Sequence, residues 1–232
     1  MKIGILTQPL HNNYGGLLQA YALKETLLSL GHETVVINRR GKNASWLRKH
    51  ASILKSRALG RNINPKLLIN NRFEKIISQE TLKFQKKYIP ELSHLITDNK
   101  EMLSLNDMKF DGYVVGSDQC WRPRYSSNIR NYFLDFAKDE KNIKRVSYAA
   151  SFGVTEWEFT DEDTKVCRSL LKKFDAVSVR EDSGIELVRK YLGRDDAVHV
   201  IDPTMLLSVD KYEEIIPLLD EAEKLVESFL NS

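Results

Sequence analysis

The sequence predicts an α/β domain built on a parallel sheet of about six strands, with helices on both faces. Short apolar runs alternate along the chain with amphipathic helical patterns, and this alternation is typical of βαβ units. The length of 232 residues suits one large domain, or one domain with an insertion. With 42% hydrophobic and 29% charged residues, the chain has the composition of a globular protein with a sizeable core.

The first elements follow from apolar spacing and glycine placement. Residues 2–8 form an apolar run that predicts a buried strand, and residues 9–14 form a polar loop. A helix over residues 15–30 follows, because leucines and alanines recur at helical spacing and Gly31 sits where a helix would end. Residues 33–38, rich in valine and isoleucine, predict the second strand.

The later elements repeat this alternation. Four further apolar runs have the length of buried strands, at residues 111–115, 144–150, 176–179 and 198–201. Amphipathic patterns predict three further helices, at residues 161–173, 182–192 and 210–230. Pro217 would bend the last of them.

Basic residues concentrate between residues 39 and 88. This stretch holds 14 lysines and arginines and two acidic residues, a net charge of +12 in a chain that carries +3 overall. We interpret it as the solvated face of a helical insertion at about residues 42–105 within a domain of residues 1–209, followed by a terminal helix at 210–232. An anionic membrane surface is the second interpretation. No nucleic-acid partner is expected, because aromatic residues are few and no recognition motif accompanies the charge.

Composition also bounds the compartment. Cys120 and Cys167 are the only cysteines, too few for a disulfide scaffold, so a reducing environment is expected. The first residues lack the apolar length of a signal peptide, and no apolar run approaches the ~18 residues of a membrane span. We therefore expect a cytoplasmic protein, either free or peripheral at the inner face of the membrane.

Residues with possible chemistry follow five of the six predicted strands. Ligands of an open parallel sheet bind beyond the carboxyl ends of its strands, so this convergence predicts a site there. After the first strand comes Asn13-Tyr14-Gly15-Gly16, with Gln19 one turn later. The two glycines allow backbone amides to approach an anion at a helix N-terminus, although a tight turn would explain them equally well. The dinucleotide and P-loop spacings are absent.

The strand at residues 111–115 is followed by Gly116-Ser117-Asp118-Gln119-Cys120-Trp121. A carboxylate directly beyond an apolar strand can act as a general base or orient a hydroxyl, which makes Asp118 a catalytic candidate. The alternative is that Asp118 caps a short helix, as aspartate often does after a strand. We favour the functional interpretation.

Two further strand ends contribute candidates. Arg180 follows residues 176–179, where a guanidinium suits bidentate capture of a carboxylate or phosphate. The alternative for Arg180 is a structural ion pair with Glu181 or another acid.

Ser151 follows residues 144–150 as a candidate hydrogen-bond donor, and Asp202 is interpreted as a cap beside a proline.

No metal site is expected, because the five histidines show no ligand spacing. His11 alone lies on a strand-end loop and is a candidate for ligand contact. Cys120 has no paired histidine, so we expect it to pack rather than act as a nucleophile.

Six motifs, in order over roughly residues 1–210, resemble the polysaccharide pyruvyl transferase family. The opening motif runs from Gly4-Ile5-Leu6-Thr7 through Asn13-Tyr14-Gly15-Gly16-Leu17-Leu18-Gln19 to Gly31-His32-Glu33. The others are Val115-Gly116-Ser117-Asp118-Gln119-Cys120-Trp121, Tyr132-Phe133-Leu134-Asp135-Phe136, Ser147-Tyr148-Ala149-Ala150-Ser151-Phe152-Gly153, Val177-Ser178-Val179-Arg180-Glu181 and Asp202-Pro203-Thr204-Met205-Leu206-Leu207. Cys120 departs from the small aliphatic residue expected there.

The resemblance implies a Rossmann-like half of a glycosyltransferase-B-like architecture, in which two halves face each other across a cleft. It implies transfer of pyruvate from phosphoenolpyruvate, a co-substrate with no other cofactor, to a sugar of a bacterial cell-surface glycan, free or lipid-linked, as a ketal. Asp118 would orient or deprotonate the acceptor hydroxyl, and Arg180 would hold the donor. The expected substrate-binding residues are Asn13, Tyr14, Gly15, Gly16, Gln19, Gly116, Ser117, Gln119, Trp121 and Ser151.

Length separates this chain from the family pattern, which continues after the Asp202 motif into a second Rossmann-like half. Only about 28 residues follow Thr204. We therefore expect a short member, a truncated product, or a half that needs a partner chain or a homo-oligomer, with little activity alone. The alternatives are a non-catalytic half-domain that binds a glycan or a partner, and a nucleotide-sugar glycosyltransferase.

Overall fold

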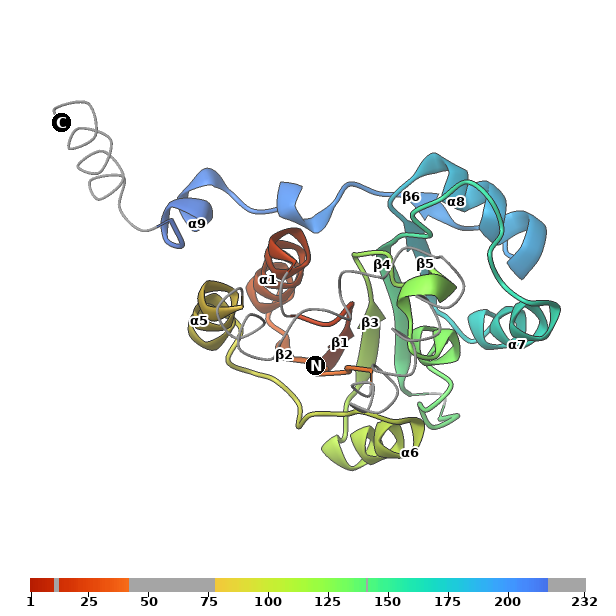
Figure 1. Ribbon diagram of the computed structural model, residues 1–232, viewed down its shortest axis with the longest axis horizontal. Coiled ribbons are helices and arrows are strands. Elements are labelled where there is room, and N and C mark those ends of the chain that lie inside the picture. The colour runs from red at the N-terminus through yellow and green to blue at the C-terminus, as the bar shows by residue number, and fades with distance from the viewer. Residues whose placement is uncertain (11–12, 42–77, 141, 217–232) are drawn as a thin grey trace, which may run out of the picture.

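A parallel sheet forms the middle of the molecule (Figure 1). The computed structural model describes residues 1–10, 13–41, 78–140 and 142–216. The strands are β1 (Lys2–Leu6), β2 (Glu33–Val36), β3 (Gly112–Val115), β4 (Lys144–Ala150), β5 (Ala176–Val179) and β6 (Val198–His199). All pairs are parallel, in the order β2-β1-β3-β4-β5-β6, so the predicted fold class is confirmed. β1, β2 and β6 end two residues earlier than predicted.

The direction of winding reverses between β1 and β3. From β1 the chain moves to β2 on one side, whereas β3 to β6 proceed toward the other. Leu6 pairs with Val115, and the Gly116 N–H donates to the Leu6 carbonyl at 3.1 Å, so the segments that leave the two strands start side by side. In an open α/β sheet, this switch point is where a ligand crevice forms.

Helix α1 (Tyr14–Ser29) covers one face of the sheet, and α5 (Gln79–Tyr88) packs beside it. Asn13 caps α1 by accepting the Gly16 N–H at 3.1 Å, which starts the helix one residue before the predicted position. Tyr21 meets the rings of Phe84 and Tyr88 edge-on, each with ring centroids 5.9 Å apart. α1 is thus held by its N-terminal cap and by the aromatic contacts with α5.

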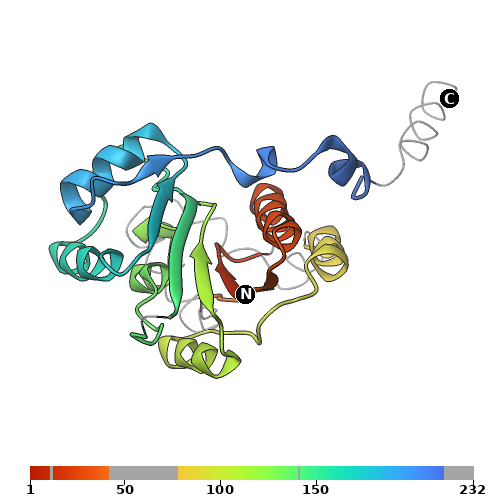
Figure 2. The same ribbon diagram turned by 180° about the vertical axis from the view of Figure 1, so that it is seen from behind.

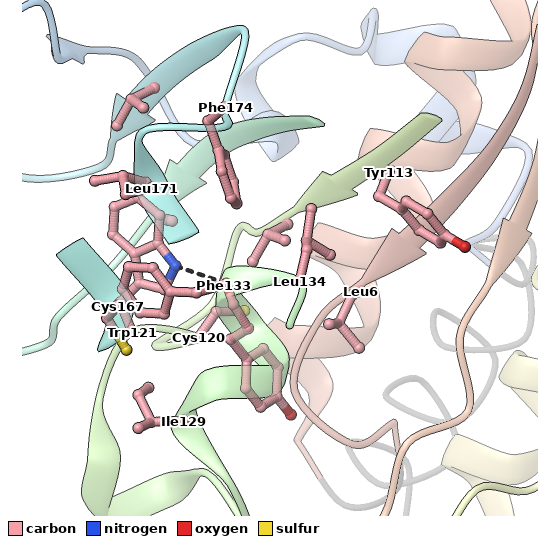
Figure 3. Close-up of a cluster of buried hydrophobic side chains, with 14 of the residues drawn as sticks. Leu6, Tyr113, Cys120, Trp121, Ile129, Phe133, Leu134, Cys167, Leu171 and Phe174 are labelled. Atoms are coloured by element: carbon pink, nitrogen blue, oxygen red, sulfur yellow. Dashed lines mark hydrogen bonds between the residues drawn. The ribbon is translucent and has the colours of Figure 1, made fainter. Parts of the chain in front are cut away.

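The opposite face carries the larger core cluster (Figure 3). Here α7 (Asp161–Leu171), α8 (Asp182–Leu187), α6 (Asn99–Met102) and the short 3-10 helix η3 (Ile129–Phe133) surround apolar side chains of the strands. The helix predicted at residues 182–192 is divided, because its second half is a π-helix, η4 (Val188–Leu192). The remaining elements are the 3-10 helices η1 (Leu103–Met108), η2 (Pro123–Tyr125) and η5 (Pro203–Met205), and α9 (Val209–Glu213).

The segment after β6 crosses over α1, which it contacts through η5 (Figure 2). Of the terminal helix predicted over residues 210–230, the structure describes only the part up to residue 216, where α9 ends at Glu213; the rest stays a prediction. Residues 217–232 lie outside the described residues, as do residues 42–77 of the predicted insertion. The proposed domain limits therefore stay predictions. None of the described helices has the length and apolar character needed to cross a bilayer.

Gly116 is a position where a side chain cannot fit. Its φ of +143° suits glycine alone, and a Cβ there would overlap the Tyr148 carbonyl oxygen on the neighbouring strand. Gly116→Ala should therefore reduce the free energy of unfolding by about 3 kcal/mol or more, measured by urea denaturation. Gly31→Ala is the control, because Gly31 also has positive φ (+82°) but nothing within 4 Å, and it should lose only about 1 kcal/mol. Equal losses would contradict the steric argument.

Candidate functional site

The carboxyl ends of β1 and β3 are joined by side chains at the switch point. Asn13, from the loop after β1, donates through Nδ2 to Oδ2 of Asp118 at 3.2 Å, while its Oδ1 caps α1. Gly16 lies beneath this contact, and a Cβ there would stand 3.1 Å from both Asn13 Nδ2 and Asp118 Oδ2. The glycine loop thus leaves room for Asp118 against the start of the helix.

Asp118 is half-buried and held from two sides. Its Oδ1 accepts the Gln119 N–H at 2.7 Å, and its carbonyl accepts the Ser151 N–H at 3.2 Å. No helix begins at Asp118, since the next helical turn starts at Pro123. The alternative that Asp118 is a helix cap is therefore not supported, and its carboxylate is fixed beside the start of α1, where the chain leaves β3.

Arg180 connects the ends of three strands. Its Nε lies 3.1 Å from Glu181 Oε1, and its Nη1 lies 3.5 Å from Asp202 Oδ2 and 3.4 Å from the Ser117 carbonyl oxygen. The ion pair considered as an alternative for Arg180 is thus present. The guanidinium is half-buried, so a ligand that used it would share it with two carboxylates.

Asp202 is a site residue that the sequence argument missed. The predicted cap is confirmed, because Oδ1 accepts the Thr204 N–H at 3.0 Å. Its other oxygen, Oδ2, accepts a hydrogen bond from Gln19 Nε2 on α1 and faces Arg180. Only its position in the sequence could have identified Asp202 as a site residue, because it follows the last strand just as Asp118 and Arg180 follow their strands.

This edge of the sheet has an acidic character in its described part. Glu181 and Asp202 flank the Arg180 guanidinium, Asp118 lies at the neighbouring end of β3, and the Ser151 hydroxyl donates to Glu181 Oε1 at 2.7 Å. Among the described residues, no group of three or more acidic, histidine or cysteine side chains could hold a metal ion. The arrangement can accept hydrogen bonds from hydroxyl groups and offers one shared cation to an anion.

Trp121 corrects an expectation. It was expected to contact substrate, yet its side chain is completely buried in the core (Figure 3). Its ring stacks on Phe133 with centroids 5.0 Å apart, and its Nε1 donates to the Tyr132 carbonyl at 3.0 Å. The chain folds back beneath the edge at Trp121, because its N–H donates to the Ser151 carbonyl at 3.1 Å. Trp121 therefore anchors the segment after β3 in the core and does not face a ligand.

Ser151 and Ser117 are likewise buried, at 0% and 1% exposure, rather than lining an open surface. The Ser151 hydroxyl is engaged by Glu181 and by the Gly153 N–H at 2.9 Å, so the expected contact with substrate is replaced by a positioning role. The Ser117 hydroxyl has no partner among the described residues. Gly116 is buried against Tyr148 and shapes the turn.

The other candidates have mixed surroundings. Gln119 is held by Arg122, whose Nη1 donates to its Oε1 at 3.2 Å. Tyr14 and Gly15 are exposed at the start of α1, and their binding role stays a prediction. His11 lies outside the described residues. Cys120 is fully buried, and burial raises the pKa of its thiol to about 12, so the expected packing role is confirmed.

Comparison with known proteins identifies the family. A sequence profile described as polysaccharide pyruvyl transferase matches residues 13–231. The chain belongs to this family. No curated protein matches it. A solved alpha-glucosyltransferase in complex with UDP-glucose and DNA containing an abasic site aligns at 10% identity with a TM-score of 0.39, over 86% of this chain. The chain spans 41% of the length of that protein.

In this family member, we expect no reactive thiol in the native state. Cys120 and Cys167 are both buried, and burial raises each thiol pKa to about 12, so neither forms the nucleophilic thiolate. A thiol-specific disulfide reagent at mildly alkaline pH should label neither cysteine before unfolding and both in denaturant. Rapid labelling of one thiol in the folded protein would show that its burial is not maintained in solution.

Proposed function

We propose that this chain takes part in transferring pyruvate from phosphoenolpyruvate to two hydroxyl groups of a bacterial glycan sugar, forming a ketal. The observation that supports it is the meeting of Asn13 and Asp118 at the switch point of a family member, beside the Arg180–Asp202 pair. The acceptor would be a surface-glycan sugar, free or lipid-linked, and the latter would place the protein at the inner membrane face.

The reaction needs proton transfer and charge stabilisation. The methylene carbon of the enol takes a proton, the carbon that bears the phosphate is attacked by one sugar hydroxyl, and a second hydroxyl closes the ring as inorganic phosphate leaves. One hydroxyl proton balances the proton added to carbon, and the other leaves with phosphate. A carboxylate near the acceptor hydroxyl and cations near the donor would serve these steps.

Asp118 is suited to the acceptor hydroxyl. Among the described residues its Oδ2 has one neutral partner, Asn13, and its orientation is set by the Gln119 N–H on Oδ1. A sugar hydroxyl could donate to Oδ2 from the crevice and lose its proton there. Gln19 and Asn13 would add amide groups for further hydroxyls, and Arg180 would meet the donor from the β5 end of the edge.

The charge at this edge suggests that a second wall completes the site. Phosphoenolpyruvate carries a carboxylate and a phosphate, whereas Arg180 is already shared by Glu181 and Asp202. Neutral, hydroxyl-rich ligands fit the described edge better than an anion does, so a glycan-binding half-domain is the second candidate function. Under the catalytic proposal, a facing half, from a partner chain or a second copy, supplies more cations in a glycosyltransferase-B-like arrangement.

Asp118→Asn tests the acceptor role. The amide keeps the size of the side chain but cannot accept a proton at neutral pH, so glycan-dependent phosphate release by the complete system should fall at least about 100-fold. The melting temperature should stay close to that of the wild type. Asp111→Asn is the matched control, because Asp111 lies at the opposite end of β3, where its Oδ2 accepts the Lys2 N–H at 2.6 Å. Retained activity with a large loss of stability would assign Asp118 a structural role.

The 232-residue chain alone should release little or no phosphate from phosphoenolpyruvate. Catalysis that holds donor and acceptor in reacting geometry can contribute up to ~7–11 kcal/mol, and an open acidic edge cannot supply it for an anionic donor. A phosphate-release assay with purified chain and acceptor glycan measures this. Robust glycan-dependent release without a partner would show that a second wall is not required.

A further inference from the structure

Arg39 is a buried arginine at the same edge of the sheet as the candidate site. It follows β2 and is 4% exposed, although it begins the basic stretch that the sequence suggested was solvated. The backbone explains its placement: Ile37 continues the pairing with β1 through its N–H to the Ile5 carbonyl at 2.8 Å, and Arg39 forms a parallel bridge with Ile96. The side chain therefore leaves the chain just beyond the end of β2.

Among the described residues, the Arg39 guanidinium donates hydrogen bonds only to neutral oxygens. Nε donates to Asn131 Oδ1 at 3.2 Å, Nη1 to the Arg40 carbonyl at 2.6 Å, and Nη2 to Asn99 Oδ1 at 3.4 Å. Within the described part of the chain, it forms no ion pair with a carboxylate, and two of its five N–H groups have no acceptor. Burying an unpaired charge is costly, so a buried arginine with no counter-charge among the described residues calls for an explanation.

Arg145 shows how this protein otherwise buries an arginine. It lies on β4 toward the amino end of the sheet, is also buried, and donates to the Ile143 and Lys138 carbonyls. Two carboxylates stand within its electrostatic reach. The pKa of Asp175 is lowered chiefly by a hydrogen bond from Lys144 and further by Arg145, and that of Asp139 chiefly by Lys173 and further by Arg145. Arg145 thus lies within reach of carboxylates, although, like Arg39, it donates its side-chain hydrogen bonds to neutral oxygens among the described residues.

Tyr132 links Arg39 to the candidate site. Burial raises the pKa of Tyr132, the charges of Cys120 and Asp118 raise it further, and the charge of Arg39 opposes that rise. The contact is also geometric: Arg39 Nε donates to Asn131, and the carbonyl of the next residue, Tyr132, accepts the Trp121 Nε1–H, so η3 connects Arg39 to the segment that follows β3. Asn99, which makes the longest of the three contacts, is exposed at the start of α6, so Nη2 lies directly beneath a surface residue.

We propose that Arg39 is an anion-binding residue of this site, and that its Nη2 edge takes a carboxylate or phosphate oxygen of a small anionic substrate. Binding would exchange the long contact to Asn99 for a charge-assisted hydrogen bond and would supply a counter-charge that the described residues do not. The inference rests on the proposed function only in taking phosphoenolpyruvate as the natural anion. The alternative is a purely structural clamp that ties Asn99 and Asn131 to the end of β2.

The test compares wild type, Arg39→Gln and the control Arg145→Gln in the full 232-residue chain. Phosphoenolpyruvate, inorganic phosphate and pyruvate are each titrated by calorimetry and by the rise in melting temperature that ligand binding produces. Arg39→Gln should bind the preferred anion at least about tenfold more weakly, because a hydrogen bond to a charged group is lost. Arg145→Gln should lose stability without ligand yet keep wild-type affinity. Pyruvate and phosphate show which anionic group Arg39 meets.

The outcomes separate the two proposals. Unchanged affinity in Arg39→Gln, with a lower melting temperature in the absence of anions, would make Arg39 a clamp and leave the proposed function standing. Binding of phosphate or pyruvate that depends on Arg39, without binding of phosphoenolpyruvate, would support Arg39 and overturn the donor assignment. A wild-type chain that binds none of the three would overturn the role of Arg39. If Arg39→Gln does not fold, Arg39→Lys replaces it: a several-fold loss of affinity is expected because the planar fork is gone, and no change would count against the proposal.

Discussion

Parallel pairing of β1 with two neighbours is the constraint on which the rest of this molecule depends. Because β1 is flanked by β2 and β3, the chain leaves the carboxyl ends of two adjacent strands in different directions. From β1 it turns toward β2, and from β3 it turns toward β4. The segments that follow β1 and β3 are joined where they begin, because the Gly116 N–H donates to the Leu6 carbonyl. Beyond this bond, Asn13 from the segment after β1 meets Asp118 from the segment after β3.

The second organising feature is a set of polar contacts that spans the edge from β3 to β6. Arg180 reaches the Ser117 carbonyl, Glu181 and Asp202, and Asp202 in turn holds Gln19 of α1. Partly buried polar contacts strengthen one another and tolerate few gaps, so the strand ends keep a common alignment. The same contacts set the charge of the edge, which favours hydroxyl groups over anions wherever Arg180 is the only cation within reach.

Much of the fold could be predicted because its signals are local. The strands at residues 144–150 and 176–179 have the predicted limits, and Gly31 lies at the end of α1 with the positive φ that its position implied. The short sequence beyond each strand could not reveal which way a side chain turns. Trp121 and Ser151 belong to segments that hydrogen-bond to each other under the edge, a long-range contact that no spacing encodes. Arg39 was misjudged for the same reason, since its burial depends on Asn99 and Asn131, far along the chain.

The anchoring of α5 has a consequence for how this protein can change over evolution. The buried Lys24 of α1 donates to the Tyr88 carbonyl and pairs with Glu91, and residues 91–96 then run beside β2 through bridges at Val36 and Arg39. The chain thus departs from the sheet and returns to it at two fixed points. A substitution at Lys24 would therefore disturb α1, the end of α5 and the return of the chain to β2 together. Evolutionary change at Lys24 is thus coupled to change at Glu91, which lies at the far end of the same contact.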